Sequence, residues 1–246
     1  IGRNLFEGPN NNAKSAESRM KKSTAPRPAE DTAPPNGRKT AYHHGNLRPA
    51  LLEGALALLE EHGVAELSLR MLARQLGVSQ AAPYHHFADK NALLVALAVE
   101  GFQRAARVLR TVSIEHYSLE RRVRGLCRGY VRFAKETPEL FRLMYGTTIQ
   151  RKEDYPELVA ASTESFEALA SLIEAMIVDF KIEHVSAKHA TVILLGLNHG
   201  LAHLLIDRRS SPVLGEVLGN DRAIIEEAAR LFVSGFHPAG AGFSGK

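Results

Sequence analysis

From Leu47 onwards, apolar side chains recur at steps of three and four residues, the spacing that places them on one face of an α-helix. The first such series comprises Leu51, Leu52, Ala55, Leu58 and Leu59. No stretch shows sustained alternation of apolar and polar residues between turn dipeptides, as a half-buried strand would. We therefore expect an all-α protein.

Caps and helix breakers divide this helical stretch into segments. Ser68 and Ser79 are good N-caps for two short helices, expected at about 69–76 and 80–87, with Gly77 between them. Asp89 caps a long helix that ends near residue 112. Further helices are expected at about 119–136, 138–145, 156–181, 186–208 and 221–236, with loops at 146–154 and 209–220.

These segments predict five parts: a tail (1–40), a small helical unit (41–90), a connecting helix (91–112), a larger bundle (113–237) and a flexible end (238–246). The tail is rich in proline and poor in large apolar residues, so we predict that it is disordered. Its residues 1–19, which precede Met20, are either vector-derived or an upstream extension.

The net charge of +4 belongs to the tail, which holds eight Lys or Arg and four acidic residues. The rest of the chain carries 23 residues of each sign, so its balance predicts no basic surface. The tail cations either solubilise the chain or add salt-dependent affinity for phosphates.

Several classes of protein are disfavoured. The single cysteine, Cys127, excludes an intramolecular disulfide framework and a multi-cysteine metal site. No apolar run of about 18–20 residues and no signal peptide is recognised, which predicts a cytoplasmic protein. The chain has no Gly-rich phosphate loop, nucleophile elbow or metal-ligand cluster, so we expect no enzyme activity, no cofactor and no metal.

Residues 69–87 have the form of a helix-turn-helix unit, in which two short helices are joined by a tight turn. Ala73 is small where the helices must cross, Gly77 permits the turn, and Val78 anchors it. The outer positions of the second helix are small or hydrogen-bonding, which suits insertion into the major groove of DNA. Pro83 fits poorly, because it disfavours helical geometry at Ala82.

Four strings in residues 42–112, about a third of the chain, resemble the DNA-binding region of TetR-family transcriptional regulators. They are Tyr42-His43-His44-Gly45-Asn46-Leu47-Arg48, Ser68-Leu69-Arg70, Leu76-Gly77-Val78-Ser79 and Pro83-Tyr84-His85-His86-Phe87-Ala88-Asp89-Lys90. The resemblance implies an N-terminal helix-turn-helix DNA-binding domain followed by a C-terminal ligand-binding and dimerisation bundle. It also implies a repressor that a small-molecule effector releases from a palindromic operator. A ligand-independent DNA-binding or architectural protein with the same unit is the alternative.

The resemblance also assigns DNA-contacting roles. Tyr84, His86, Lys90 and Ser68 match phosphate contacts, Arg70 matches a contact to phosphate or guanine, and Gln80 matches a base reader. Ser79, Ala81, Ala82 and His85 complete the predicted set. His85 stands where similar sequences often carry Arg, so its contact stays open. The first turn of a helix favours anions, which agrees with the role of Lys90 as part of a phosphate site.

By the same resemblance, the C-terminal helices enclose a pocket for a largely apolar effector. Its candidate lining residues are Phe102, Tyr130, Phe133, Met144, Tyr145, Phe166, Met176, Asn198, His199 and His203. Each of them could instead be plain core. Asn198, His199 and His203 interrupt an apolar helix, so they anchor a ligand, bond across a dimer interface or bond to nearby backbone. The string Leu195–Ala202 resembles a His-Gly segment of one C-terminal subgroup of the family.

Dimerisation is expected because one short recognition helix reads few base pairs, whereas two copies related by a twofold axis read a palindrome. The resemblance places the interface on the last two long helices. The candidate residues are Val192, Gly196, Gly200 and Leu204 together with Ile225, Ala228, Ala229 and Phe232.

Overall fold

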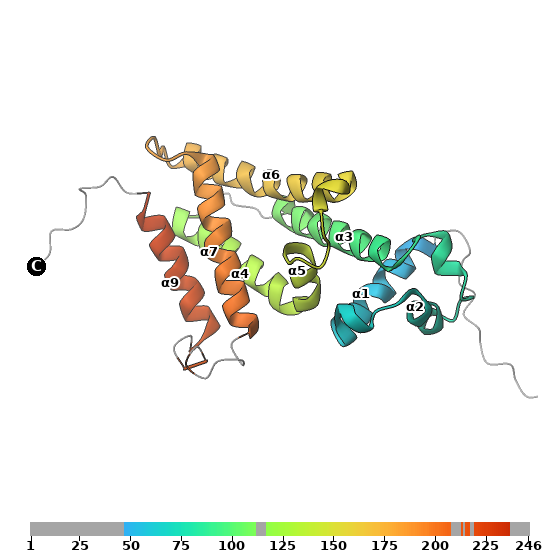
Figure 1. The fold of residues 1–246 in the computed structure, drawn as a ribbon. Coiled ribbons are helices and arrows are strands. Elements are labelled where there is room, and N and C mark those ends of the chain that lie inside the picture. The colour runs from blue at the N-terminus through green and yellow to red at the C-terminus, as the bar shows by residue number, and fades with distance from the viewer. Residues whose placement is uncertain (1–46, 112–116, 208–212, 214, 217–218, 237–246) are drawn as a thin grey trace, which may run out of the picture. The chain divides into compact units, whose positions relative to one another are not determined.

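The computed structural model describes residues 47–111, 117–207, 213, 215–216 and 219–236, and every regular element in these residues is helical (Figure 1). The α-helices are α1 (Leu47–Glu66), α2 (Leu69–Leu76), α3 (Lys90–Thr111), α4 (Leu119–Glu136), α5 (Pro138–Tyr145), α6 (Pro156–Asp179), α7 (Ala187–Asp207) and α9 (Asp221–Ser234). Two short 3₁₀ turns, η1 (Ala82–His85) and η2 (Lys152–Asp154), lie between them. The prediction of an all-α fold is confirmed. The predicted tail (1–40) and flexible end (238–246) lie outside the described residues.

Local signals in the sequence account for the geometry around α2. The Ser68 hydroxyl accepts a hydrogen bond from the Met71 amide at 3.2 Å, which caps the helix as predicted. Gly77 ends the helix in the left-handed region, at φ 65° and ψ 26°. At the end of α1, Gly63 also leaves helical geometry, with φ 71° and ψ 175°, so the last turn is set off by a kink.

The second helix of the predicted helix-turn-helix is shorter and tighter than expected. Instead of an α-helix over 80–87, the chain makes a single 3₁₀ turn at Ala82–His85. Pro83 explains the difference, because its ring disfavours the helical conformation of the preceding residue and its nitrogen has no hydrogen to donate. Ser79 does not cap this turn with its side chain; its backbone carbonyl accepts from the Ala82 amide at 3.0 Å.

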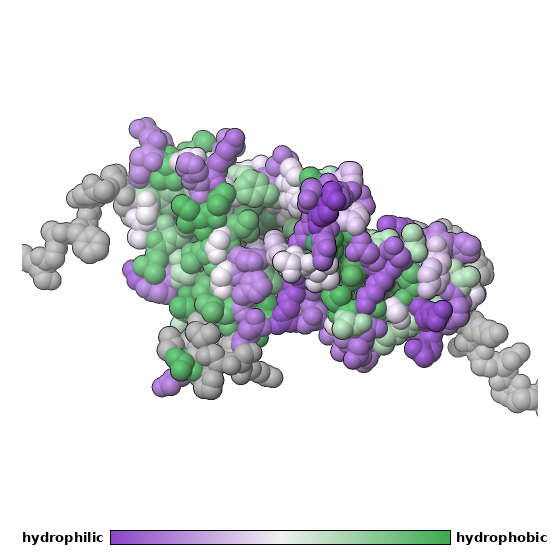
Figure 2. All heavy atoms as spheres, in the orientation of Figure 1, coloured by the Kyte–Doolittle hydropathy of each residue, from purple (hydrophilic) through white to green (hydrophobic). Residues whose placement is uncertain are grey.

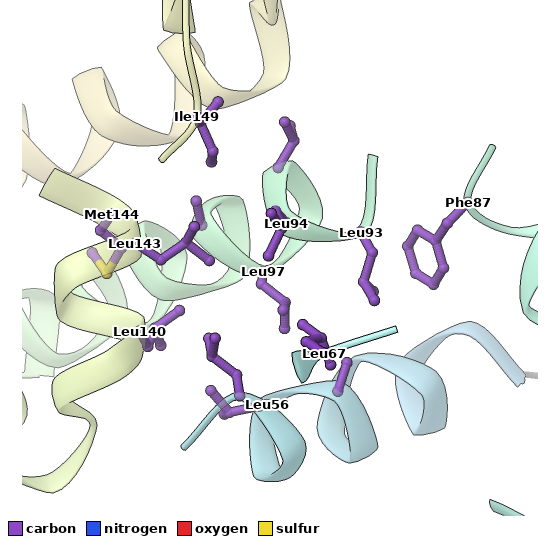
Figure 3. Packing of buried hydrophobic residues seen from close by; sticks show 14 of the residues in the cluster. Leu56, Leu67, Phe87, Leu93, Leu94, Leu97, Leu140, Leu143, Met144 and Ile149 are labelled. Carbon is purple, nitrogen blue, oxygen red and sulfur yellow. The ribbon is translucent and has the colours of Figure 1, made fainter. Parts of the chain in front are cut away.

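Two large clusters of buried residues hold the helices together, and a third, small one (Ala134, Phe141 and Ala202) joins α4, α5 and α7. The first joins α1, α2, α3 and α5 and extends to the start of α6, and Figure 3 shows its side chains gathered around Leu97 of α3. The second joins α4, α6, α7 and α9. Helix α3 also packs along α6, and α4 packs against both α7 and α9. The predicted boundaries of the connecting helix (91–112) stay a prediction. Helix α3, which covers this segment, packs against α1 on one side of it in the sequence and against α5 and α6 on the other.

Among the described helices, α7 is long and apolar enough to span a membrane by length and composition alone. This run was not expected from the sequence, because Asn198, His199 and His203 interrupt it. In the structure, one side of α7 contributes Leu194, Leu201 and other residues to the second cluster. Packing within the fold accounts for the apolar residues on that side.

Replacing Gly77 by Ala should lower the free energy of unfolding by about 1–2 kcal/mol, because a Cβ is unfavourable at a positive φ. No described atom beyond the neighbouring residues lies within 4 Å of the added Cβ, so the effect is one of backbone conformation. The matched control is Gly125→Ala in α4, where the Cβ also meets open space; there, alanine should stabilise by about 0.5–1 kcal/mol. Urea unfolding measures both, and equal effects of the two substitutions would contradict this account.

Candidate functional site

The segment from Ser79 to His86 (the exposed turn) has one buried side and one free side. Pro83 lies inside it, and Phe87, directly after it, is buried in the first cluster. The outward residues are Ser79, Gln80, Ala81, Tyr84, His85 and His86, and Ala82 is half-buried. Tyr84 is 48% exposed although it is a large aromatic residue. The buried anchors thus fix the turn while its hydrogen-bonding side chains face outward.

Three further predicted DNA contacts lie outside the exposed turn: Ser68 and Arg70 at the start of α2, and Lys90 at the start of α3. The Ser68 hydroxyl oxygen accepts from the Met71 amide, and its hydrogen remains for another acceptor. The Lys90 ammonium donates to the Ala65 carbonyl at 3.0 Å, and it retains two hydrogens for another acceptor. Arg70 is exposed and makes no ion pair within the part of the chain that the structure describes. These contacts with DNA stay predictions.

A groove of about 350 Å³ runs beside the exposed turn, between the start of α1, α3 and the start of α6. His86 and Phe87 line it, together with Arg48, whose guanidinium lies 5.5 Å from the centre of the Phe87 ring. Sequence reasoning did not single out this groove. The signals available were that Arg48 ends the first of the four strings and that His86 and Phe87 belong to the fourth.

Four of the predicted pocket residues contact Phe141 of α5, which was not selected for the pocket from the sequence, and a fifth, Phe102, contacts Tyr145. Together they form the aromatic–histidine cluster: Phe102, Tyr130, Phe141, Tyr145, His199 and His203. The Phe141 ring centre lies 5.2 Å from both histidine rings. The Tyr130 hydroxyl and His199 Nδ1 are 3.0 Å apart, and His199 Nε2 and His203 Nε2 are 3.2 Å apart.

Burial favours the uncharged forms of Tyr130, Tyr145 and His199 in this cluster. It raises the pKa of the Tyr130 and Tyr145 hydroxyls. It also lowers the pKa of His199, and the neighbouring His203 lowers it further. The bond between the two Nε2 atoms needs one protonated and one unprotonated nitrogen, so the pair does not hold two imidazolium ions in this arrangement.

The remaining predicted pocket residues are spread over the fold. Phe133 packs against both the first cluster and the small cluster around Phe141, and Met144 belongs to the first cluster, beside Gly101 of α3. Met176 lies in the second cluster. Phe166 is half-buried on α6 and makes no ring contact within the described residues. The structure thus distributes the ten residues over several packed groups, and the pocket that they would line stays a prediction.

Asn198 is a buried polar residue whose side-chain oxygen lacks a hydrogen-bond donor among the described residues. It is 2% exposed, and its Oδ1 is the one fully buried side-chain polar atom without a hydrogen-bond partner among the described residues. The thiol of buried Cys127 lies beside it, and burial raises the pKa of this thiol to about 12. An unpaired carbonyl oxygen inside the bundle is costly unless something donates to it.

The predicted dimer residues divide between surface and core. On α7, Val192, Gly196, Gly200 and Leu204 form an exposed face, to which exposed Ile193 adds. Figure 2 shows apolar side chains over the side where α7 and α9 lie.

The α9 residues differ. Ile225, Ala228 and Ala229 are buried in the second cluster and Phe232 is half-buried, so they have little surface to offer a second copy. Leu231 is the exposed large apolar residue of this helix. The sequence pattern shows the apolar face of α9 but not that α4 already covers it.

Two family models match the chain. The model of bacterial regulatory proteins of the TetR family matches residues 51–97, and a tetracyclin repressor-like C-terminal domain matches residues 123–217. The HTH-type transcriptional repressor AcnR of Corynebacterium efficiens is 44% identical over 68 residues, which is 28% of this chain and 35% of the relative. The match thus spans about a third of that curated relative.

Solved structures extend the likeness to most of the chain. A Rhodococcus sp. RHA1 protein of unknown function is 34% identical with a TM-score of 0.67, and the alignment covers 80% of this chain and 98% of that one. The regulator FadR of Bacillus subtilis, solved with stearoyl-CoA, is 15% identical with a TM-score of 0.60, over 76% and 98% of the two chains. This second likeness concerns the fold alone.

Replacing Asn198 by Leu should leave the free energy of unfolding unchanged or raise it by up to about 2 kcal/mol, because it removes an unpaired buried carbonyl at similar volume. The Asn198→Asp variant, which places a charge at the same point, should lose about 3 kcal/mol or more. Urea unfolding at neutral pH compares the two. A loss above about 2 kcal/mol for Asn198→Leu would mean that Oδ1 has a bonding partner in solution.

Proposed function

The chain belongs to the TetR family of bacterial regulatory proteins, and from this premise we propose that it is a cytoplasmic, dimeric transcriptional repressor. It binds a palindromic operator through the exposed turn and leaves it when a small, largely apolar effector binds in the C-terminal helices. Membership of a family of regulators agrees with the expectation that the chain is no enzyme.

The separation of buried anchors from exposed polar groups carries the DNA-binding part of the proposal. Tyr84 and His86 flank the exposed His85, whereas Pro83 and Phe87 are buried beneath them. The Tyr84 side chain is 48% exposed beside two exposed histidines, and its hydroxyl can donate a hydrogen bond to a phosphate oxygen. Gln80 at the start of the turn has an amide suited to a base edge.

Two copies are needed for useful discrimination. A single 3₁₀ turn offers few side chains to the bases, so each half-site contributes little specificity. The exposed apolar face of α7, with Gly196 and Gly200 at its centre, is suited to close packing against a second copy. Leu231 of α9 is a further exposed apolar side chain that a second copy could cover. A twofold axis there would set two exposed turns at a fixed spacing.

The aromatic–histidine cluster and Asn198 describe the chemistry of the effector. Because the cluster is rich in rings and burial disfavours the charged form of His199, it favours an uncharged, largely apolar molecule. The free Oδ1 of Asn198 is suited to one hydrogen-bond donor on that molecule, such as a hydroxyl or an amide. If the chain instead acts without a ligand, these polar groups serve only the internal packing.

Selection of bound duplexes from a random pool should yield an imperfect palindrome, and this measurement tests the DNA-binding proposal directly. Tyr84→Ala should weaken binding to the selected duplex about tenfold or more, because a charge-assisted bond to phosphate is lost. Failure to enrich any sequence, even at low salt, would refute the proposal.

Lys90→Gln should weaken binding to all duplexes alike and reduce the slope of log K against log[salt] by about one, as expected for one lost phosphate contact. The matched control is Lys188→Gln, which removes the same charge from an exposed position in the first turn of α7. Fluorescence anisotropy over a series of salt concentrations gives both slopes. An unchanged slope for Lys90→Gln would remove this lysine from the interface.

The effector is tested with a panel of uncharged, largely apolar molecules titrated against the operator complex. A true effector should bind the free dimer more tightly than the bound one and so weaken operator binding by tenfold or more, about 1.4 kcal/mol of differential affinity. The Asn198→Leu variant should bind the operator normally and respond less. If no compound changes operator affinity, the ligand-independent alternative gains support.

A further inference from the structure

A carboxylate from α1 holds the amino end of α5. Glu60 accepts hydrogen bonds from the backbone amides of Leu140, at 2.8 Å, and Glu139, at 3.1 Å. Both amides belong to the first turn of α5, where no carbonyl within the helix is available to them. Glu60 therefore acts as an N-cap supplied from about 80 residues away, and it joins the helix-turn-helix unit to the bundle.

Helix α5 carries the core of the aromatic–histidine cluster on its inner side. Phe141 and Tyr145 both contact His199 of α7, at ring-centre distances of 5.2 and 4.8 Å. Arg142 also pairs with Asp207 at the end of α7, at 2.5 Å. A ligand that displaces these rings would therefore move the same short helix that Glu60 caps.

The carboxyl-terminal end of α1 also contacts Lys90, one of the proposed DNA contacts. Past the kink at Gly63, the carbonyl of Ala65 near the end of α1 accepts a hydrogen bond from the Lys90 ammonium at 3.0 Å. Lys90 begins α3 shortly after the exposed turn. The carboxyl-terminal part of α1 thus touches α5 through Glu60 and a proposed phosphate contact through Ala65.

Capping α5 with the Glu60 carboxylate carries a desolvation cost, because the carboxylate is partly buried. Burial raises its pKa, and the two amide bonds only partly oppose that effect. Its contribution to stability is therefore most favourable at acid pH, below the pKa of the unfolded chain, and falls as the pH rises through the raised pKa. An exposed Ser or Asp at position 137 would cap α5 without this cost, whereas Thr137 makes no capping bond with its side chain.

We propose that Glu60 is a positioning residue that couples the bundle to the DNA-binding surface, through α5 on one side and the Ala65–Lys90 contact on the other. This inference rests on the proposed function, because it concerns how that function is regulated. A purely structural Glu60 would stabilise α5 equally with and without DNA. A coupling residue makes the order of α5 depend on whether operator is bound.

Hydrogen exchange of the full chain, with and without the selected operator duplex, separates these roles. In the unmodified protein, operator should slow exchange of the α5 segment 138–145 by about threefold or more, within the range for residues along a coupling network. In Glu60→Ala this dependence should vanish, while operator still slows exchange of segment 77–90. Glu60→Gln, which keeps one acceptor oxygen, should give an intermediate result and serves if the alanine variant fails to fold.

The matched control is Glu61→Ala, which removes the same charge from the next residue; the Glu61 carboxylate is exposed and lies 3.6 Å from His62 Nε2. It should behave as the unmodified protein does. Equal slowing of α5 by operator in Glu60→Ala and in the control would overturn the coupling role while leaving the proposed function intact. If the unmodified protein binds no duplex, the proposed function itself fails, and the coupling falls with it.

Discussion

The burial of one helix, α3, against both α1 and α5 is the constraint on which the rest of this fold depends. Leu93 and Leu97 fill the core of the helix-turn-helix unit. One turn further along, Gly101 lets Met144 of α5 approach so closely that a Cβ would lie 2.5 Å from its Sδ. Such tight packing leaves little room for α5 to move alone. We therefore expect any displacement of α5 to involve α3 and also α1, which Glu60 joins to it.

Features that depend on neighbouring residues were predicted well from the sequence. The Ser68 cap, the left-handed Gly77 and the Asp89 cap, whose Oδ1 accepts from the Ala92 amide at 2.8 Å, each follow from one residue type at one position. The sequence also indicates that Pro83 fits a helix poorly, although the pattern around it still predicts an α-helix over 80–87. A proline early in a helix is tolerated often enough that only the finished backbone decides.

Features that depend on contacts between residues far apart in the sequence could not be predicted in the same way. Glu60 reads as one more polar residue of α1, and Phe141 as one more core aromatic; only the packing of α5 between α1 and α7 shows what each contacts. The apolar face of α9 is similar. Ile225 and Ala229 suit a core and a dimer interface equally, and the choice is made by α4, which covers them. Periodicity identifies an apolar face but not its partner.

The brevity of η1 bears on how such a protein would distinguish one site in a genome from another. A recognition helix of several turns can insert many side chains into a groove, whereas a four-residue turn sets down only a few. Much of the discrimination then passes from the chemistry of individual bases to the distance between half-sites and the bendability of the duplex between them. If two copies read two half-sites, as we propose, the spacing between them is defined only when each copy is rigid, and rigidity would then contribute to selectivity as much as the contact surface does.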